Sequence, residues 1–305
     1  MREPGKVAVL LGGNSAEREV SLRSGTAVLH ALQAQGINAQ AFDPARRTLT
    51  DLVAERFDRA FIVLHGRGGE DGAMQGALQY LNIPYTGSGV LGCALAMDKV
   101  RTKQVWQAAG LPVAPSLVVR RDGPAQDIEA MLAELGGKVM VKPAQEGSSI
   151  GMSSASTVNQ LHAALQLAHQ YDAEALVESW LGGAEYTVAI LGDEALPSIR
   201  LQTTHEFYDY DAKYQATDTQ YHCPAGLSPS AEQALQHLAV SAFRALGGRG
   251  WGRVDVMCDG EGAFRLLEAN MVPGMTAKSL VPMAARARGM SFEQLVLRIL
   301  ELSEV

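Results

Sequence analysis

The stretch Val7-Ala8-Val9-Leu10-Leu11-Gly12-Gly13 is a continuous apolar run that ends in two glycines. An uninterrupted run of this kind is typical of a parallel strand that is buried on both faces. A second such run, Phe61–Leu64, enters a glycine-rich segment, and a helical pattern that ends near Gly36 lies between the two. This alternation of strand, loop and helix predicts an α/β unit with a doubly wound, Rossmann-like sheet over residues 1–98.

Two further units follow along the chain. The second, residues 99–182, contains a predicted strand at Val139–Pro143 and a helical stretch after it. The third, residues 183–305, begins with the strand pattern Glu185–Leu191. It also contains an irregular, tyrosine-rich segment at 203–226, and a loop of that length inside a compact domain is usually a lid or a binding loop.

The composition indicates an ordinary globular protein. Of its 305 residues, 47% are hydrophobic and 19% are charged, and the formal net charge is -7. An acidic protein of this kind has no electrostatic reason to bind nucleic acid or an anionic membrane. The three cysteines (Cys93, Cys223 and Cys258) lie far apart and fit a reducing compartment. The first apolar run is too short to span a bilayer, so we expect a cytoplasmic protein.

The stretch with the clearest chemistry is a predicted β-hairpin near the C-terminus. Arg253–Cys258 and Ala263–Asn270 are joined by the turn Asp259-Gly260-Glu261-Gly262, and an Asp-Gly turn between two strand patterns favours a hairpin. With a four-residue loop, Asp255 lies opposite Leu266 in the antiparallel pair.

Side chains of a strand alternate between its two faces, so this pairing gathers four polar residues on one face. They are Arg253, Asp255, Glu268 and Asn270. Asp255 and Glu268 become diagonal neighbours, about 7–8 Å apart. Mg²⁺ prefers hard oxygen ligands of this kind, which makes the face a candidate metal site. A solvent-facing hairpin in which Arg253 neutralises one acid is an equally open interpretation.

The loop Glu146–Gly151 is a candidate phosphate-binding segment. It follows a strand that carries Lys142, and its glycines let backbone N–H groups approach an anion. The Gly-Lys-Ser/Thr sequence of a Walker A loop is absent, and a plain turn is an alternative.

Glu17 and His65 each follow one of the first two buried strands, at the edge where open α/β sheets bind ligands. Each also has a structural interpretation. Asn14 can cap the next helix with Glu17 as its capping-box partner. His65 can be a buried, hydrogen-bonded core histidine.

Together these stretches resemble the ATP-grasp superfamily, and within it the D-alanine–D-alanine ligase family. The similarity runs through eight strings across nearly the whole chain: LLGGNSAEREVSLRSG, LHGRGGEDG, YTGSGVLGCALAMDK, VKPAQEGSSIGMS, FYDYDAKY, CPAGL, GWGRVDVM and PGMTAKSLVPMAA. The resemblance implies a Rossmann-like domain followed by a two-part ATP-grasp domain. It also implies ADP-forming ligation of two D-alanine molecules through a D-alanyl phosphate, for peptidoglycan synthesis.

The resemblance also implies roles for individual residues. The ATP-binding residues would be Lys99, Lys142, Glu146, Ser149, Glu178, Glu185 and Lys213. Two Mg²⁺ ions, with Mn²⁺ as a possible substitute, would be held by Asp255, Glu268 and Asn270. The residues that contact D-alanine or the reacting atoms would be Glu17, Ser148, Tyr214, His65, Arg253, Gly274, Ser279 and Leu280. Within these sets, Glu17 would bind the first D-alanine's ammonium and form a triad with Ser148 and Tyr214.

Three positions depart from the family pattern. Met271 and Val272 follow the predicted ligand Asn270, and Lys278 stands beside Ser279 where histidine is common. We expect these changes to affect metal or second-substrate affinity rather than the reaction class. The alternatives are another ATP-grasp carboxylate–amine ligase, a D-alanine–D-lactate ligase, or a non-catalytic nucleotide-binding module. The resemblance implies that Tyr214 goes with an amine as second substrate, and it also implies a homodimer.

Overall fold

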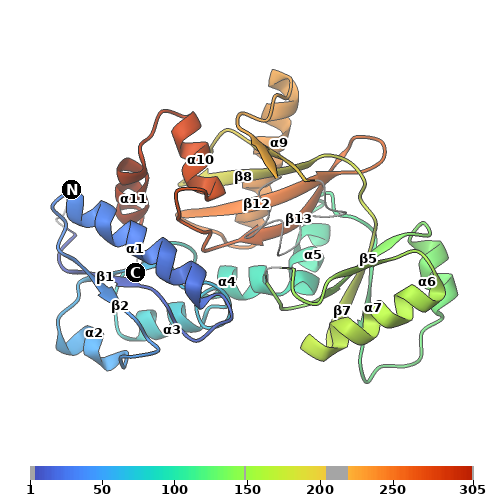
Figure 1. The fold of residues 1–305 in the computed structure, drawn as a ribbon, viewed down its shortest axis with the longest axis horizontal. Coiled ribbons are helices and arrows are strands. Elements are labelled where there is room, and N and C mark those ends of the chain that lie inside the picture. The colour runs from blue at the N-terminus through green and yellow to red at the C-terminus, as the bar shows by residue number, and fades with distance from the viewer. Residues whose placement is uncertain (1–3, 148, 204–218, 304–305) are drawn as a thin grey trace.

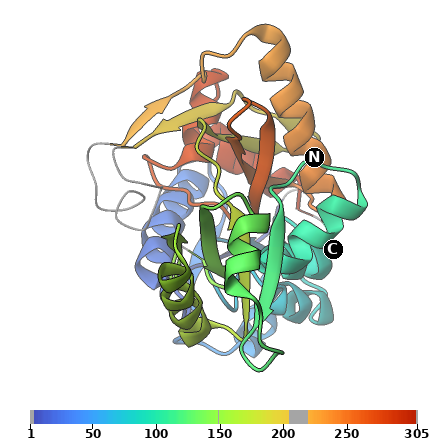
Figure 2. The same cartoon turned by 90° about the vertical axis from the view of Figure 1, so that its right-hand side faces the viewer.

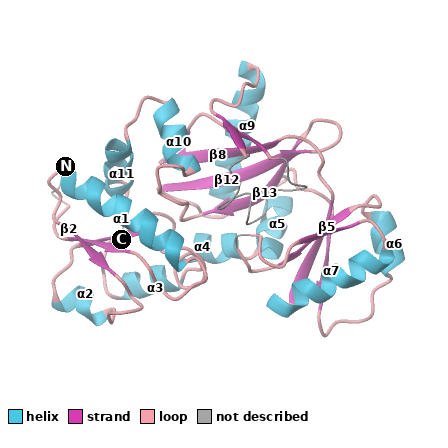
Figure 3. Ribbon diagram, in the orientation of Figure 1, coloured by secondary structure: helices cyan, strands magenta, loops and turns pink. Residues whose placement is uncertain are grey.

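The structure is a computed structural model that describes residues 4–147, 149–203 and 219–303. The molecule contains three sheets with helices packed around them, and the third sheet along the chain lies between the other two (Figures 1 and 3). Ser148, Lys213 and Tyr214, which the sequence places in the site, lie outside the described residues. Among the residues described, no helix is long and apolar enough to cross a membrane.

The first sheet is parallel, with β1 (Val7–Leu10) between β2 (Ala39–Phe42) and β3 (Arg59–Ile62). All four residues of β1 are fully buried, which explains its unbroken apolar sequence. The predicted parallel α/β unit is confirmed. Its helices are α1 (Arg18–Ala34), α2 (Thr50–Ala54), α3 (Ala73–Tyr80) and α4 (Val90–Met97).

Helix α1 begins later than the capping interpretation requires. Its N-cap is Glu17, without a side-chain hydrogen bond, so the assignment of Asn14 as the N-cap is wrong. The Ser15 hydroxyl accepts a hydrogen bond from the Glu17 N–H and donates one to the His65 carbonyl, so the chain turns again before the helix starts. Further along α1, a Cβ at Gly25 would lie 2.4 Å from the Cβ of Leu11, so glycine allows the helix to approach the sheet.

The second sheet is antiparallel, in the order β4-β7-β5-β6. Its strands are β4 (Ser116–Arg120), β5 (Val139–Pro143), β6 (Ser153–Ala155) and β7 (Glu174–Ser179). Helices α6 (Ile128–Glu134) and α7 (Val158–Tyr171) cover its outer face, which Figure 2 shows toward the viewer. Helix α5 (Lys99–Ala108) connects the first sheet to this one.

The third sheet is also antiparallel, in the order β11-β10-β8-β12-β13, and the short β9 pairs with β8. Its strands are β8 (Glu185–Leu191), β9 (Glu194–Ala195), β10 (Ile199–Gln202), β11 (Gln220–His222), β12 (Trp251–Cys258) and β13 (Phe264–Asn270). Helix α9 (Pro229–Ala245) packs against it, with Phe243 buried. The segment 203–226 was predicted to be irregular. Part of it, Gln220–His222, instead forms strand β11, because these three residues pair with β10.

The last two helices return to the first sheet. Helices α10 (Leu280–Ala287) and α11 (Phe292–Glu301) share one hydrophobic core with β1 and α1 (Figure 1). The Gln35 side chain donates to the Glu293 carbonyl at 2.7 Å, and the Arg59 guanidinium bonds the Ser303 hydroxyl. The C-terminal helices therefore complete the core that the N-terminal strands begin.

Candidate active site

The acidic hairpin has a different register from the predicted one. Cys258 pairs with Phe264, so the loop has one residue more than expected, and a β-bulge at Leu267 shifts the register again. Asp255 therefore lies directly opposite Glu268 rather than opposite Leu266. The predicted pairing is wrong. The predicted shared face is confirmed, because directly opposed residues point to the same side of a sheet.

Asp255 is held by two neighbours on this face. The Arg253 Nε and Nη2 atoms donate to its two carboxylate oxygens at 2.8 and 2.7 Å. The Thr187 hydroxyl donates to Oδ1 at 2.5 Å. This bidentate ion pair is the one expected if Arg253 neutralises an acid of the hairpin. It fixes the orientation of the Asp255 carboxylate.

The donors on this face fit a magnesium ion that arrives with a nucleotide. In the described part of the chain, no three His, Cys, Asp or Glu side chains form a metal-binding cluster. Asp255 and Glu268 instead supply two carboxylates, and Asn270 adds an amide oxygen, which accepts the Val272 N–H at 3.2 Å. Mg²⁺ is usually bound by one or two carboxylates and completed by phosphate oxygens and water, so a smaller protein donor set is sufficient.

A cavity of about 590 Å³ brings together residues from all three units. Its volume is in the range of small-molecule sites. The first unit contributes Glu17, His65 and Glu70; the second contributes Lys99 and Glu146; the third contributes Arg253, Glu268, Asn270, Gly274, Ser279 and Leu280.

A smaller cavity of about 100 Å³ shares Arg253, Glu268 and Leu280 with the first. Its walls are largely apolar, from Met140, Met152, Trp180, Leu181, Met257 and Leu267. Four residues predicted to bind ATP also line it: Lys142, Ser149, Glu178 and Glu185. The walls form an apolar slot beside polar and charged side chains, a combination that suits a nucleotide base. Sequence patterns could not show these apolar residues to be site residues, because buried methionine and tryptophan are also typical of any core.

A buried carboxylate stands between two lysines beside this slot. The Oε1 atom of Glu178 lies 2.5 Å from the Lys103 Nζ, and its Oε2 lies 2.6 Å from the Lys142 Nζ. Burial raises the pKa of Glu178, but Lys142 and Lys103 outweigh it and lower the pKa to about 2. Burial lowers the pKa of Lys103, and Glu178 opposes that effect. Lys103 was not among the predicted site residues.

Arg67 and Glu146 connect the first unit to the second. The Lys99 ammonium donates to the Glu146 carbonyl, and the Glu146 carboxylate accepts a 3.0 Å bond from Arg67 of the glycine-rich loop. The predicted phosphate-binding loop is thus held against the loop that follows β3.

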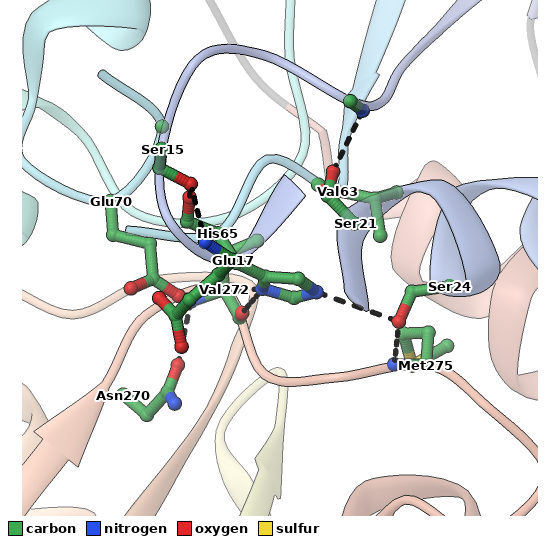
Figure 4. Close-up of polar contacts among 12 residues, drawn as sticks. Ser15, Glu17, Ser21, Ser24, Val63, His65, Glu70, Asn270, Val272 and Met275 are labelled. Atoms are coloured by element: carbon green, nitrogen blue, oxygen red, sulfur yellow. Dashed lines mark hydrogen bonds and ion pairs between the residues drawn. The ribbon is translucent and has the colours of Figure 1, made fainter. Parts of the chain in front are cut away.

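His65 lies at the centre of a buried polar cluster (Figure 4). Its Nδ1 atom is 2.9 Å from the Val272 carbonyl oxygen and 3.5 Å from Oε1 of Glu70. Its Nε2 atom is 3.5 Å from the Ser24 hydroxyl, which accepts the Met275 N–H at 3.1 Å. A carbonyl can only accept, so Nδ1 carries a proton. His65 therefore ties the loop after β3 to the loop after β13.

Two carboxylates adjoin this histidine. Figure 4 shows the side chains of Glu17 and Glu70 pointing toward one another and toward Asn270. Burial alone would lower the pKa of His65, but its bond to Glu70 and the charges of Glu70 and Glu17 raise it above 6.5. Burial and the charge of Glu17 raise the pKa of Glu70. Two acids facing one cavity can bind a cation such as an ammonium group. No sequence pattern marks Glu70 as a site residue, although it follows β3 in the same glycine-rich loop as His65.

We predict that Glu70→Gln lowers the pKa of His65, because burial is then opposed by one negative charge fewer. NMR titration of the imidazole Cε1–H signals measures this shift, and the other histidines serve as internal controls. An unchanged His65 midpoint in the variant would contradict the assigned coupling.

Ser279 lies at the start of α10 as its N-cap residue. Its hydroxyl accepts the Thr276 N–H at 2.9 Å and lies 2.9 Å from the Thr276 hydroxyl. A Cβ at Gly274 would lie 3.0 Å from the Ser279 hydroxyl oxygen, so the loop folds closely over this residue. The backbone N–H groups of a helix N-terminus, here including that of Leu280, favour a negatively charged group.

Met271 is directed into the protein core. Its side chain is 2% exposed, and its sulfur lies 3.3 Å from the Ser88 hydroxyl. Val272 is also buried, whereas Lys278 is exposed at the rim of the larger cavity. Met271 therefore belongs to the core, and it also borders the larger cavity.

We predict that Met271→Thr destabilises the protein by about 2–3 kcal/mol, because it removes buried volume and leaves a cavity. The magnesium concentration that gives half-maximal activity should stay within about twofold, since the Asn270 amide is unchanged. Urea unfolding and a magnesium titration of initial rates measure the two effects. A tenfold change in magnesium dependence without loss of stability would contradict the assignment of Met271 to the core.

Two antiparallel sheets that enclose a lysine-edged slot, with an acidic hairpin on one of them, define the ATP-grasp class of ligases. A family model described as "D-ala D-ala ligase C-terminus" matches residues 105–301, and one described as "D-ala D-ala ligase N-terminus" matches residues 38–88. The chain belongs to the D-alanine–D-alanine ligase family.

Its relatives are similar over nearly their whole length. The chain is 64% identical to the D-alanine–D-alanine ligase of Idiomarina loihiensis, over 97% of this chain and 96% of that protein. It is 62% identical to that of Pseudoalteromonas translucida, with the same shares covered. A crystal structure of the Bacillus anthracis D-alanine–D-alanine ligase matches with a TM-score of 0.87 and 30% identity, over 98% of this chain and 97% of that one. A second structure of that protein, complexed with ATP, matches with a TM-score of 0.85, 27% identity and the same coverage.

Proposed function

We propose that the protein joins two D-alanine molecules to form D-alanyl-D-alanine, and that it converts ATP to ADP and phosphate in the process. The observation that carries this proposal is the composition of the larger cavity. Glu17 and Glu70 suit an ammonium group, the N-terminus of α10 suits a carboxylate, and the acidic hairpin adjoins the apolar slot. The relatives named D-alanine–D-alanine ligase support the same reaction.

In the first step, a carboxylate oxygen of the first D-alanine attacks the γ-phosphorus of ATP, and the bond to the β-phosphate oxygen breaks. Glu17 would hold the ammonium of this substrate, while Lys99 and Lys142 would neutralise phosphate charge. Phosphoryl transfer depends mainly on positioning and charge neutralisation, which explains the lysines. Two Mg²⁺ ions, or Mn²⁺ in their place, held by Asp255, Glu268 and Asn270, would further neutralise phosphate charge.

In the second step, the amine of the second D-alanine attacks the carbonyl carbon of the D-alanyl phosphate. The amine loses a proton, and the C–O bond to phosphate breaks. Arg253 and the Gly274 N–H would stabilise the oxyanion that develops at this carbon. Ser279 and the Leu280 N–H would bind the carboxylate of the second substrate. We further propose that Ser148 and Tyr214 form a triad with Glu17, and that Lys213 contacts the γ-phosphate.

Phosphate release from ATP at neutral pH, measured with and without D-alanine, tests the proposal. We expect release to depend on D-alanine. When D-alanine and D-lactate compete, the dipeptide should predominate over the depsipeptide. Nucleotide binding without D-alanine-stimulated turnover would instead favour a non-catalytic module, and mainly depsipeptide would favour a D-alanine–D-lactate ligase.

We also propose that the protein acts in the cytoplasm as a homodimer and supplies peptidoglycan synthesis. We further propose that the chain is divided into three domains, residues 1–98, 99–182 and 183–305. Analytical ultracentrifugation tests the oligomeric state, and a purely monomeric species at micromolar concentration would contradict the dimer.

A further inference from the structure

We propose that Lys103 is a positioning residue of the nucleotide site. Lys103 neutralises Glu178 without itself lining a cavity, and so leaves the charge of Lys142 for the nucleotide phosphates. This inference rests on the proposed ATP-binding function of the slot.

Lys103 is buried next to the nucleotide site without lining it. It lies on α5 one helical turn after Lys99, and it is 2% exposed. Its ammonium contacts the Glu178 carboxylate at 2.5 Å and donates to the Ala114 carbonyl at 3.2 Å. Lys142 lines the smaller cavity, whereas Lys103 is not among the described residues that line either cavity. Lys103 therefore acts on the site through Glu178.

The cluster of Lys103, Lys142 and Glu178 carries a net positive charge. Two ammonium groups and one carboxylate leave one positive unit. With Lys142 and Glu178 alone, the pair would have no net charge and would attract an anion less strongly. These groups are almost excluded from water, so solvent and salt screen their interactions weakly. Lys103 thereby lets one carboxylate hold Lys142 in place without cancelling its effect.

Each carboxylate oxygen of Glu178 contacts a different lysine. Oε1 contacts Lys103 and Oε2 contacts Lys142, so the carboxylate plane is fixed from two sides. A carboxylate held in this way gives Lys142 a single orientation on β5, next to the slot. Loss of Lys103 would remove both the extra charge and one of these two restraints.

Titration calorimetry of ADP with MgCl₂ tests the proposal, because it measures nucleotide binding without D-alanine turnover. In Lys103→Met we expect the dissociation constant of ADP to rise about 10- to 100-fold. The KM for D-alanine should change less than about twofold, because Glu17 and Ser279 are untouched. Arg101→Met is the matched control: Arg101 lies on the same helix but is 41% exposed and pairs with Glu174, so ADP binding should be unchanged.

Lys103→Arg and Lys103→Gln separate charge from packing. Arginine keeps the positive charge beside Glu178, whereas glutamine can still bond the Ala114 carbonyl but carries no charge. We expect Lys103→Gln to weaken ADP binding as Lys103→Met does, and Lys103→Arg to keep the ADP dissociation constant within about threefold of the parent value. A purely structural role predicts the opposite, since the bulkier arginine disturbs the buried site more than glutamine. If Lys103→Met does not fold, Lys103→Gln replaces it in the comparison with Arg101→Met.

Two results would overturn the inference: ADP binding within threefold of the parent in Lys103→Met, or ADP binding in Lys103→Arg that is as weak as in Lys103→Gln. Failure of the ligase proposal is a separate result. It would appear as phosphate release that does not depend on D-alanine, while ADP binding in the parent protein persists. A parent protein that does not bind ADP would overturn both.

Discussion

Replacement of Glu268 by glutamine should lower the turnover rate by about 10²- to 10³-fold at saturating ATP and D-alanine. Glu268 lies directly opposite Asp255, and among the described residues it is the one carboxylate that lines both cavities. Glutamine keeps the size and one oxygen but loses the negative charge that a hard divalent cation requires. A coupled assay of ADP formation over a range of MgCl₂ concentrations measures the effect.

Glu261→Gln provides the matched control. Glu261 is an exposed residue in the loop of the same hairpin, and the same exchange there should leave the rate within about twofold. Activity of Glu268→Gln above one tenth of the parent value at every magnesium concentration would contradict the metal assignment. Equal losses in both variants would point to damage to the hairpin instead.

Glu17→Gln should lower kcat/KM for the activated D-alanine by about 100-fold or more, because a charge-assisted bond to its ammonium is replaced by a neutral one. Glu17 stands just before α1, at the wall of the larger cavity and near Glu70. ADP binding should be unchanged, since Glu17 does not line the smaller cavity. D-alanine saturation curves, together with calorimetry of ADP, separate these two effects.

Glu19→Gln is the corresponding control, because Glu19 is exposed in the first turn of the same helix. Its kinetic constants should match those of the parent within about twofold. An increase in the ADP dissociation constant of Glu17→Gln equal to the loss in kcat/KM would refute a specific role in binding the amino acid.

Alternation of side chains predicted the shared face of the hairpin although the predicted register was wrong. The loop has one residue more than assumed, and the bulge at Leu267 adds another. The two shifts together amount to two residues, which restores the alternation, so Asp255 and Glu268 still share a face. The bulge itself could not be predicted from the sequence, because Leu266 and Leu267 are both apolar and no break in the alternation marks the extra residue.

Other parts of the site depend on contacts that a linear pattern cannot show. Lys103 occupies a helix where lysine is usually a solvent-exposed residue, and only the arrival of β7 makes it a buried partner of Glu178. Glu70 depends on the path of its loop. A Cβ at Gly69 would lie 2.3 Å from the Leu64 carbonyl oxygen, so the loop can fold back only with glycine there. The buried runs at β1, β5 and β8, by contrast, were predictable because burial on both faces requires apolar residues throughout.

The return of α10 and α11 to the first sheet has a consequence for how the chain acquires its structure during synthesis. The strands of the first sheet are synthesised before the helices that cover α1, and Ser24 and Met275 are 251 residues apart. Contacts of such long sequence separation form slowly. The earlier part of the nascent chain therefore carries uncovered apolar surface until α10 and α11 have been made, which is the condition in which chaperones bind. Gly274 and Ser279 also line the larger cavity, so this cavity cannot be complete before that part of the chain has been synthesised.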